Sequence, residues 1–132
     1  MIKLKILGGG NRVNIVVGVQ SRLSSKRLPG KALLKLSNTT ILGMTLSRCK
    51  LLDYPTYLLT SNRNEDELLI KEAFLNNIDD VIRGSLDNVL SRFILLSEKV
   101  KPDFIVRVTA DNPLTEFRFI KPLISYMKEI NL

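Results

Sequence analysis

A run of apolar, mostly β-branched residues at positions 13–19, VNIVVGV, constrains the fold of this chain most strongly. The run shows no helical period and is short, which is typical of a strand buried on both faces. Three further strands are predicted at residues 57–60, 81–83 and 104–108. A strand buried on both faces requires helices above and below the sheet to which it belongs.

Helical patterns alternate with these strands. Apolar residues recur at helical spacing in four segments, at about residues 41–49, 64–76, 86–97 and 116–130. The capping cluster Asn38-Thr39-Thr40 precedes the first segment, and Asn64 with Glu67 forms a capping-box-like start to the second. Pro122 falls inside the last segment, so that helix either begins near Lys121 or bends there.

The alternation predicts an α/β fold with a mostly parallel sheet and helices on both faces. Ligands of such folds bind at the carboxyl ends of the strands, so we expect the functional loops to follow Val19, Thr60, Arg83 and Val108. With 132 residues and no Gly/Ser/Pro-rich linker, the chain is expected to form one domain over residues 13–132. Residues 1–12 are interpreted as a flexible leader.

Composition excludes several classes of protein. The start of the chain lacks the features of a secretory signal, and its apolar runs are too short to span a membrane, so we expect a cytoplasmic protein. The chain has one cysteine and no histidine, which excludes an internal disulfide and the usual zinc ligand sets. Any metal must therefore be held by oxygen. Cys49 and Met44 are predicted to be core or near-core residues.

Positive charge is concentrated in the first part of the chain. Residues 1–50 hold ten Lys or Arg and no acid, whereas residues 51–132 hold ten bases and thirteen acids. Such a one-sided field attracts polyanions, either a nucleic acid or a nucleoside triphosphate. The densest part, residues 19–36, has five basic residues and Pro29-Gly30 at its centre.

This basic stretch leaves the first strand where backbone N–H groups of α/β folds often bind phosphates. It matches neither the Walker pattern nor GxGxxG. Arg22, Lys26, Arg27 and Lys31 have the chemistry to surround a triphosphate, with the Pro29-Gly30 turn aiming Lys31. Charge alone is equally compatible with a solvated basic loop.

Three motifs resemble one family. SRLSSKRLPGKAL resembles the ARxxSxRLPGKxL signature of the cytidylyltransferases that activate acidic sugars, closest to the SpsF-type spore coat polysaccharide biosynthesis proteins. RGSLDNVLSRF and VRVTADNPL are similar to that subfamily's RGSxxDVLxRY and VRITADCPL. Three motifs in the same order and at similar spacing make a strong match, which covers roughly residues 13–125.

The resemblance implies a Rossmann-like nucleotidyltransferase fold and transfer of CMP from CTP to an acidic or related sugar, with Mg²⁺ as cofactor. A sugar hydroxyl would attack the α-phosphate of CTP, giving CMP-sugar and pyrophosphate. Positioning and charge neutralisation achieve most of such chemistry, so the absence of histidine is no obstacle.

The resemblance also assigns roles to single residues. Arg22, Arg27 and Lys31 match triphosphate-binding positions, Ser25 matches the serine of the same loop, and Lys26 stands where threonine is common. Asp111 matches the metal-binding aspartate, and Arg22, Lys31 and Asp111 are the expected catalytic residues. Residues expected near the nucleoside are Thr60 and Ser61 after the second strand, and Arg83, Gly84, Asp87 and Arg92 in the second motif.

Some of these positions keep structural alternatives. Asp111 in ADNP has the pattern of a turn residue. Asp87 has the pattern of a helix N-cap, and Arg92 that of a solvated residue on the same helix.

The family's enzymes are longer than this chain, so we expect an incomplete, N-terminal nucleotide-binding part that is active, inactive or completed by a partner chain. An incomplete sheet exposes an edge or an apolar face, which predicts a homo-oligomer. A non-catalytic nucleotide-binding module is the first alternative function. A small basic nucleic-acid-binding domain is the second, although the sequence has no matching motif and few aromatic residues.

Overall fold

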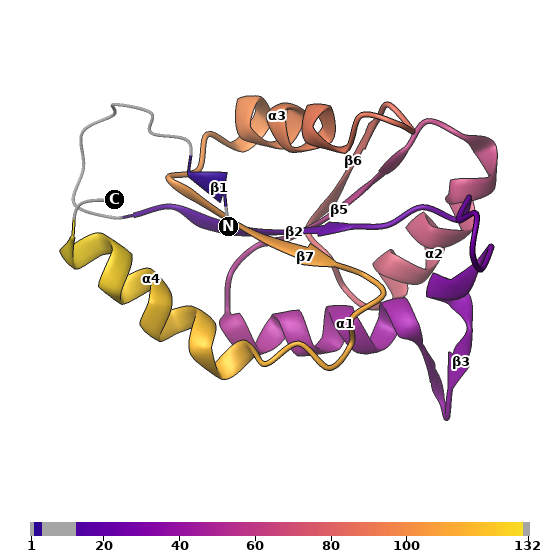
Figure 1. The fold of residues 1–132 in the computed structure, drawn as a ribbon, viewed down its shortest axis with the longest axis horizontal. Coiled ribbons are helices and arrows are strands. Elements are labelled where there is room, and N and C mark those ends of the chain that lie inside the picture. Colours follow the sequence, from indigo (N-terminus) through magenta and orange to yellow (C-terminus); the bar gives the residue numbers. More distant parts are fainter. Residues whose placement is uncertain (1, 4–12, 131–132) are drawn as a thin grey trace.

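A five-stranded sheet forms the centre of the molecule in the computed structural model, which describes residues 2–3 and 13–130 (Figure 1). Its spatial order is β1-β7-β2-β5-β6. The strands are β1 (Ile2–Lys3), β2 (Ile15–Gln20), β5 (Thr56–Ser61), β6 (Asp80–Gly84) and β7 (Phe104–Thr109). The last four are mutually parallel, and β1 pairs antiparallel with β7. The mostly parallel sheet predicted from the sequence is confirmed.

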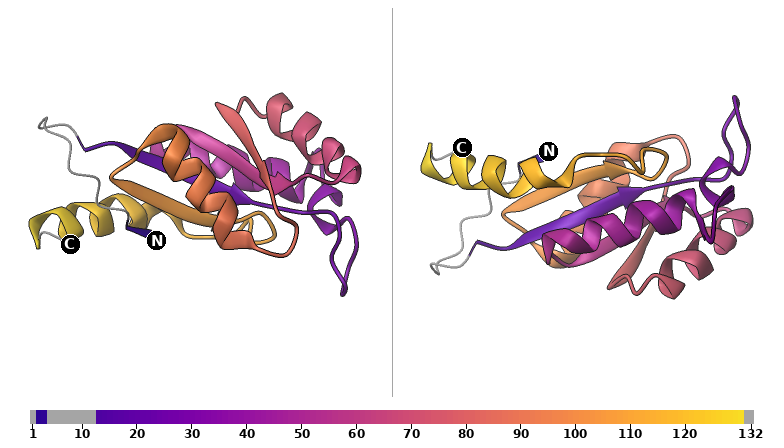
Figure 2. Two further views of the ribbon diagram at one scale, coloured as in Figure 1. Left: turned by 90° about the horizontal axis from the view of Figure 1, so that it is seen from above. Right: turned by 90° about the horizontal axis from the view of Figure 1, so that it is seen from below.

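Helices cover both faces of this sheet (Figure 2). The helices are α1 (Ile41–Cys49), α2 (Glu67–Leu75), α3 (Val89–Val100) and α4 (Ile120–Glu129). Helix α3 packs on one face through Phe93 and Leu96, whereas α1, α2 and α4 share the core of the other face. Four single 3₁₀ turns connect the elements, η1 (Lys31–Leu33), η2 (Lys50–Leu52), η3 (Asn64–Asp66) and η4 (Phe117–Phe119).

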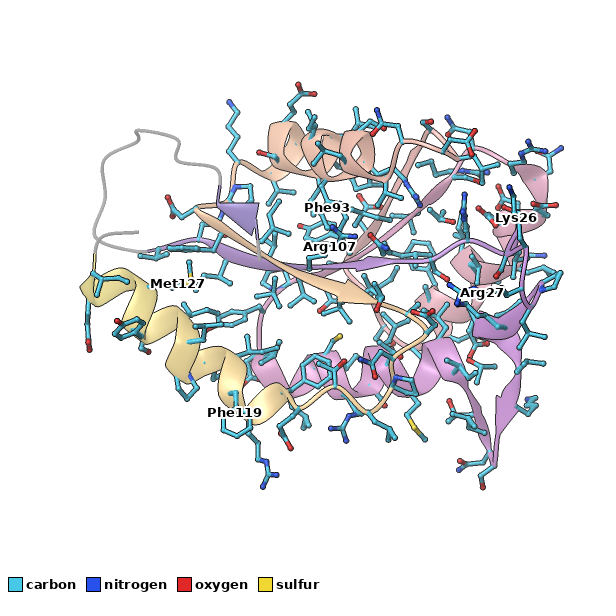
Figure 3. All side chains as sticks on the ribbon, viewed as in Figure 1. Lys26, Arg27, Phe93, Arg107, Phe119 and Met127 are labelled. Carbon is cyan, nitrogen blue, oxygen red and sulfur yellow. The ribbon has the colours of Figure 1, made fainter. Side chains whose placement is uncertain are left out.

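Strand β2 is buried on both faces, as its sequence predicts. Val17 and Val19 belong to the core beneath α1, and Val16 belongs to the core beneath α3. Gly18 lies under α3, where an added Cβ would come 2.9 Å from Cε1 of Phe93, so the helix can approach closely only because the side chain is absent. The Arg107 guanidinium lies 5.5 Å from the centre of the Phe93 ring on the same face (Figure 3).

The helix starts follow the sequence only in part. Thr40 caps α1 by accepting a hydrogen bond from Gly43 N at 2.9 Å, within the predicted capping cluster. The predicted capping box of the second helix is wrong, because η3 occupies its first turn and the side chain of Glu67 pairs with Arg83 instead.

The structural alternative for Asp87, that it is the N-cap of the third helix, is also wrong. Asn88 caps α3 by accepting from Ser91 N at 3.0 Å. Helix α4 begins at Ile120, so Pro122 lies in its first turn, where its missing N–H breaks no intrahelical bond.

Two short strands were not predicted. β3 (Lys35–Leu36) and β4 (Thr39–Thr40) form a small antiparallel pair, and Ser37 between them has a φ of 57°. Ile2 and Lys3 of the predicted leader form β1, while residues 1 and 4–12 lie outside the described residues.

One further feature of the fold agrees with the sequence analysis. Cys49 is a buried free cysteine, and burial raises the pKa of its thiol to about 12, as expected of a core residue. Within residues 2–3 and 13–130, no helix combines the length and the apolar character needed to cross a bilayer.

Candidate functional site

A cavity of about 470 Å³ opens at the carboxyl edge of the sheet, where the strand order places the loops after β2 and β7 side by side. Its walls come from the loop after β2, from η1, from α3 and from the end of β7. The lining residues are Gln20, Ser21, Arg22, Ser25, Lys26, Arg27, Lys31, Ala32, Val89, Arg92, Thr109, Ala110 and Asp111. Five of them are cationic and one is a carboxylate, so the cavity is strongly positive.

Residues 21–31 of the basic stretch wrap around this cavity in a defined conformation. The Leu23 carbonyl accepts hydrogen bonds from the N–H groups of Ser25 and Gly30, both at 2.9 Å. Gly30 has a φ of 69°, the left-handed conformation that favours glycine, and Lys31 follows it as the first residue of η1. Figure 3 shows Lys26 and Arg27 at the end of the molecule that lies away from α4.

Lys31 and Asp111 meet across the cavity, although they lie 80 residues apart in the sequence. The Lys31 ammonium donates to Oδ2 of Asp111, and both side chains are partly exposed. This hydrogen bond is the main reason why the pKa of Asp111 lies below its usual value; burial opposes the shift. The basic stretch and the carboxylate after β7 therefore converge, as the sequence predicts.

Arg92 is the most buried cation of the site. Only 1% of it is exposed, which corrects the alternative of a solvated helix residue. Its Nη1 donates to the Leu59 carbonyl at 3.3 Å, and its Nε has no partner among the described residues. Burial, together with the positive charge of Arg22, lowers the pKa of Arg92. An under-partnered, buried guanidinium on the cavity wall is suited to bind an anion.

Arg22 is held at the rim of the cavity by the segment between β6 and α3. Its Nη1 donates to the Leu86 carbonyl at 3.1 Å and lies 3.9 Å from Oδ1 of Asp87. The Asp87 side chain is 94% exposed and does not line the cavity. The Asp87 carboxylate therefore lies near the rim of the cavity but outside the group of cations that line it.

Thr60 and Ser61 are fully buried at the end of β5 and do not line the cavity. Both donate their hydroxyl protons to Asp66, a buried carboxylate that the sequence analysis missed. The available signal was an acid that closely follows a strand end. The helical pattern of residues 64–76 instead made Asp66 look like an ordinary first-turn residue.

Arg83 and Gly84, at the end of β6, lie behind the cavity wall. Arg83 pairs with Glu67 and donates to the Ser61 carbonyl at 3.2 Å. A Cβ added to Gly84 would come 2.9 Å from Cγ of Arg92, so the absence of a side chain makes room for that arginine. These two residues thus adjoin the site through their neighbours.

Asp111 is the single carboxylate that lines the cavity. In the described part of the chain, no group of three or more His, Cys, Asp or Glu side chains could hold a metal by itself. Mg²⁺ often binds through one or two carboxylates plus substrate phosphates, so a lone carboxylate in a cavity lined by several cations fits that ion.

One protein family matches the part of the chain that contains the site. The profile of one family, described as cytidylyltransferase, matches residues 16–131, which include all the residues that line the cavity. The chain belongs to the cytidylyltransferase family. The three motifs noted in the sequence surround the cavity of this cytidylyltransferase chain, which supports the same assignment.

Two curated relatives and one solved structure are similar to the chain. The chain is 37% identical over 123 residues to an uncharacterised protein, MJ1063, of Methanocaldococcus jannaschii, covering 90% of this chain and 49% of that protein. It is 34% identical over 113 residues to the spore coat polysaccharide biosynthesis protein SpsF of Bacillus subtilis, covering 78% and 45%. A cytidylyltransferase structure from Leptospira borgpetersenii superposes with a TM-score of 0.82 at 31% identity, covering 87% and 49%.

This cytidylyltransferase chain spans about half the length of the curated relatives that it matches. The matched part carries the basic stretch, the carboxylate after β7 and the buried arginine of α3.

Proposed function

We propose that this chain is the nucleotide-binding part of an enzyme that transfers CMP from CTP to a sugar during polysaccharide biosynthesis. The observation that carries the proposal is the convergence of Arg22, Lys31 and Asp111 on one cavity at the carboxyl edge of the sheet. Family membership supplies the reaction class, and the cavity supplies the chemistry for binding a triphosphate.

The cations of the cavity bind the triphosphate in this proposal. Arg22 and Arg27 present planar guanidinium groups that can each engage two phosphate oxygens, whereas Lys31 acts as a point charge. Ser25 supplies a hydroxyl on the same wall, and Lys26 adds a further charge at the mouth. Arg92 contributes a buried charge whose attraction is screened less by water than that of a surface residue.

Asp111 would hold the metal, for which Mg²⁺ is the proposed ion. Without a nucleotide, its carboxylate is already paired with Lys31. On binding of the nucleotide, Lys31 would turn to a phosphate oxygen and the Asp111 carboxylate would hold the ion. The ion would supply neutralisation of charge on the phosphate oxygens.

Transfer itself requires positioning more than proton chemistry. The sugar hydroxyl loses its proton and forms a bond to the α-phosphorus, and the bond from the α-phosphorus to the bridging oxygen of pyrophosphate breaks. Arg22, Arg27 and Lys31 neutralise the charge that develops on the departing pyrophosphate. The catalytic roles proposed for Arg22, Lys31 and Asp111 are of this kind.

The nucleoside lies, in this proposal, along the ends of β5 and β6. Thr60, Ser61, Arg83, Gly84 and Asp87 belong to these two strand ends or to the loop that follows β6. Gly84 packs against Arg92 and Asp87 lies near Arg22, so a base and ribose attached to the bound phosphates would extend towards these strand ends. The proposed acceptor is an acidic or related sugar, and the proposed location is the cytoplasm.

A non-catalytic nucleotide-binding module is the second candidate. Its support is the cavity with its five cations, which would bind a nucleotide with or without a later transfer step. The two candidates share the cavity and differ in whether CMP is transferred.

The test combines binding with turnover. The chain is titrated with CTP with and without Mg²⁺ by calorimetry, and pyrophosphate release is followed with candidate sugar acids. Mg²⁺-dependent CTP binding with pyrophosphate release is expected of the enzyme; the same binding without release identifies the module. Absence of CTP binding by the folded chain would overturn both.

The carboxylate is tested separately with Asp111→Asn, a nearly isosteric change. The variant should remain folded but lose the Mg²⁺ dependence of CTP binding, because an amide is a poor ligand for that ion. Asp53→Asn is the matched control, since Asp53 is an exposed carboxylate that pairs with Lys121 away from the cavity. Unchanged metal dependence in Asp111→Asn would remove this residue from the site.

A further inference from the structure

Asp66 is a completely buried carboxylate that receives four hydrogen bonds from neutral donors. Its Oδ1 accepts from Leu23 N at 2.8 Å. Its Oδ2 accepts from Thr60 Oγ1 at 3.0 Å, from Ser61 N at 3.1 Å and from the Ser61 hydroxyl. Asp66 forms no ion pair in the described part of the chain. A buried carboxylate needs such donors, because burial without hydrogen bonds is strongly unfavourable.

The four bonds join two parts of the molecule that are distant in sequence. Three of them fix the end of β5, five or six residues before Asp66. The fourth reaches back 43 residues to the basic stretch. The carboxylate is therefore a junction between the sheet and the phosphate-facing loop.

Leu23 is the residue through which this junction can act on the whole stretch. Its N–H is held by Asp66, and its carbonyl accepts the N–H groups of Ser25 and Gly30. Arg22 precedes this point, and Lys31 follows Gly30 directly. Fixing one peptide group thus fixes the start and the end of the segment that carries the cavity's cations.

We propose that Asp66 is a positioning residue that holds the basic stretch in its phosphate-binding conformation before a nucleotide arrives. This proposal rests on the proposed function, because it assigns a triphosphate to the cavity. Asp66 does not act as an ordinary helix cap: it directly precedes α2, but its side chain accepts no hydrogen bond from the first turn of that helix, and η3 has no side-chain cap either. Preorganisation raises affinity by removing the cost of ordering a loop on binding.

Asp66→Asn tests the junction, since an amide has one accepting oxygen and its NH₂ group must face donors. The N–H groups of Leu23 and Ser61 cannot reverse. Because Oδ2 accepts three bonds and Oδ1 only one, the amide oxygen should take the place of Oδ2, and the bond from Leu23 N is lost. CTP affinity should fall about tenfold, which corresponds to ~1.4 kcal/mol, and CMP affinity should fall less, because the monophosphate uses less of the basic stretch.

Asp79→Asn is the matched control. Asp79 accepts from Thr56 N at 2.7 Å, at the other end of the same strand, so this substitution also replaces a carboxylate acceptor by an amide oxygen but touches no part of the loop. Its ratio of CTP to CMP affinity should equal that of the unchanged protein. An equal ratio in Asp66→Asn as well would show a merely structural role and overturn the proposal.

A measurement without nucleotide keeps the proposal separate from the proposed function. Amide hydrogen exchange of the unchanged chain should show Leu23 protected relative to Arg22 and Ser24, and Asp66→Asn should remove that protection. Exchange of Leu23 as fast as its neighbours in the unchanged protein would overturn the proposal even if the variant does not fold. Protected Leu23 in a chain that binds no CTP would refute the proposed function while supporting Asp66 as the residue that orders the loop.

Discussion

The contact between Lys31 and Asp111 determines how the site behaves at the scale of single residues. Each side chain neutralises the other while the cavity is free of nucleotide, and each has the charge that a triphosphate or a metal ion would attract. The pair therefore holds one positive and one negative side chain at the cavity without leaving either charge unpaired. In the proposed function, binding of a triphosphate with its metal ion would exchange this contact for two others.

Lys31→Ala should weaken CTP more than CMP. In the proposed function, the lysine faces the phosphates that only the triphosphate possesses. One charge-assisted hydrogen bond contributes about 1.5–3 kcal/mol, or roughly 10- to 150-fold in affinity. Calorimetric titration with both nucleotides measures the difference. Lys35→Ala is the control, because Lys35 is an exposed cation of β3 outside the cavity. Equal weakening of CTP and CMP by Lys31→Ala would contradict the assignment.

The pKa of Asp111 provides a second prediction at this scale. The hydrogen bond from Lys31 lowers this pKa, so the ion pair stabilises the fold above the unfolded-state pKa of about 3.9, and that stabilisation is lost as the pH falls through the lower folded value. Lys31→Ala should return the pKa upward. Carboxyl chemical shifts followed by NMR from pH 2 to 6 report it, and identical titration curves for the two proteins would refute the coupling.

At the scale of elements, α1 begins at a cap that also ties it to α2. Thr40 accepts from Gly43 N at 2.9 Å and donates its hydroxyl to Glu72 at 2.6 Å. Thr40→Ala removes both bonds and should lower the free energy of unfolding by about 1–2 kcal/mol. Urea denaturation measures this loss. Ser47→Ala, on the exposed side of the same helix, should change stability little; a loss as large as that of Thr40→Ala would show that the cap is unimportant.

The sequence predicts those elements whose signal is local. Short apolar runs predicted the four parallel strands, and Thr40 was marked by its capping cluster. The residues of the site that share one motif with their neighbours, such as Arg22 and Lys31, could be chosen by their charge and spacing.

Contacts between distant segments could not be predicted in this way. Arg92 stands beside Phe93 in the helical pattern, and local sequence suggests a solvated cation, but the missing side chain of Gly84 leaves it a buried position. Asp66 looks like a first-turn residue because its most informative partner, Leu23, lies 43 residues earlier. The cap of α3 moved by one residue from Asp87 to Asn88, a difference that propensity cannot resolve because both residue types cap helices well.

At the scale of the whole molecule, α4 carries an apolar surface beyond the one that packs on the sheet. Ile124 is buried, yet Leu123 and Tyr126 on the same helix are 50% and 58% exposed, and Phe119 of η4, directly before the helix, is 71% exposed. Figure 3 shows Phe119 pointing away from the sheet, whereas Met127 lies on the side of the core. Leu114, in the segment before η4, is 79% exposed as well.

The predicted self-association should therefore involve α4. Light scattering at increasing protein concentration should show a mass above that of one chain, and Leu123→Lys should shift the equilibrium towards monomer. Lys128→Ala, a change to an exposed cation of the same helix, is the control. A single-chain mass at every concentration would contradict the prediction.

The proposed site exists only in the folded whole, because its parts come from the segment after β2, the start of α3 and the end of β7. A crystal structure of the chain with CTP and Mg²⁺ tests this most directly. We predict that the triphosphate fills the cavity between Arg22 and Lys31, with the ion bridging a phosphate oxygen and Asp111 and with the contact between Lys31 and Asp111 opened. A triphosphate bound elsewhere, or an ion held away from Asp111, would contradict the account.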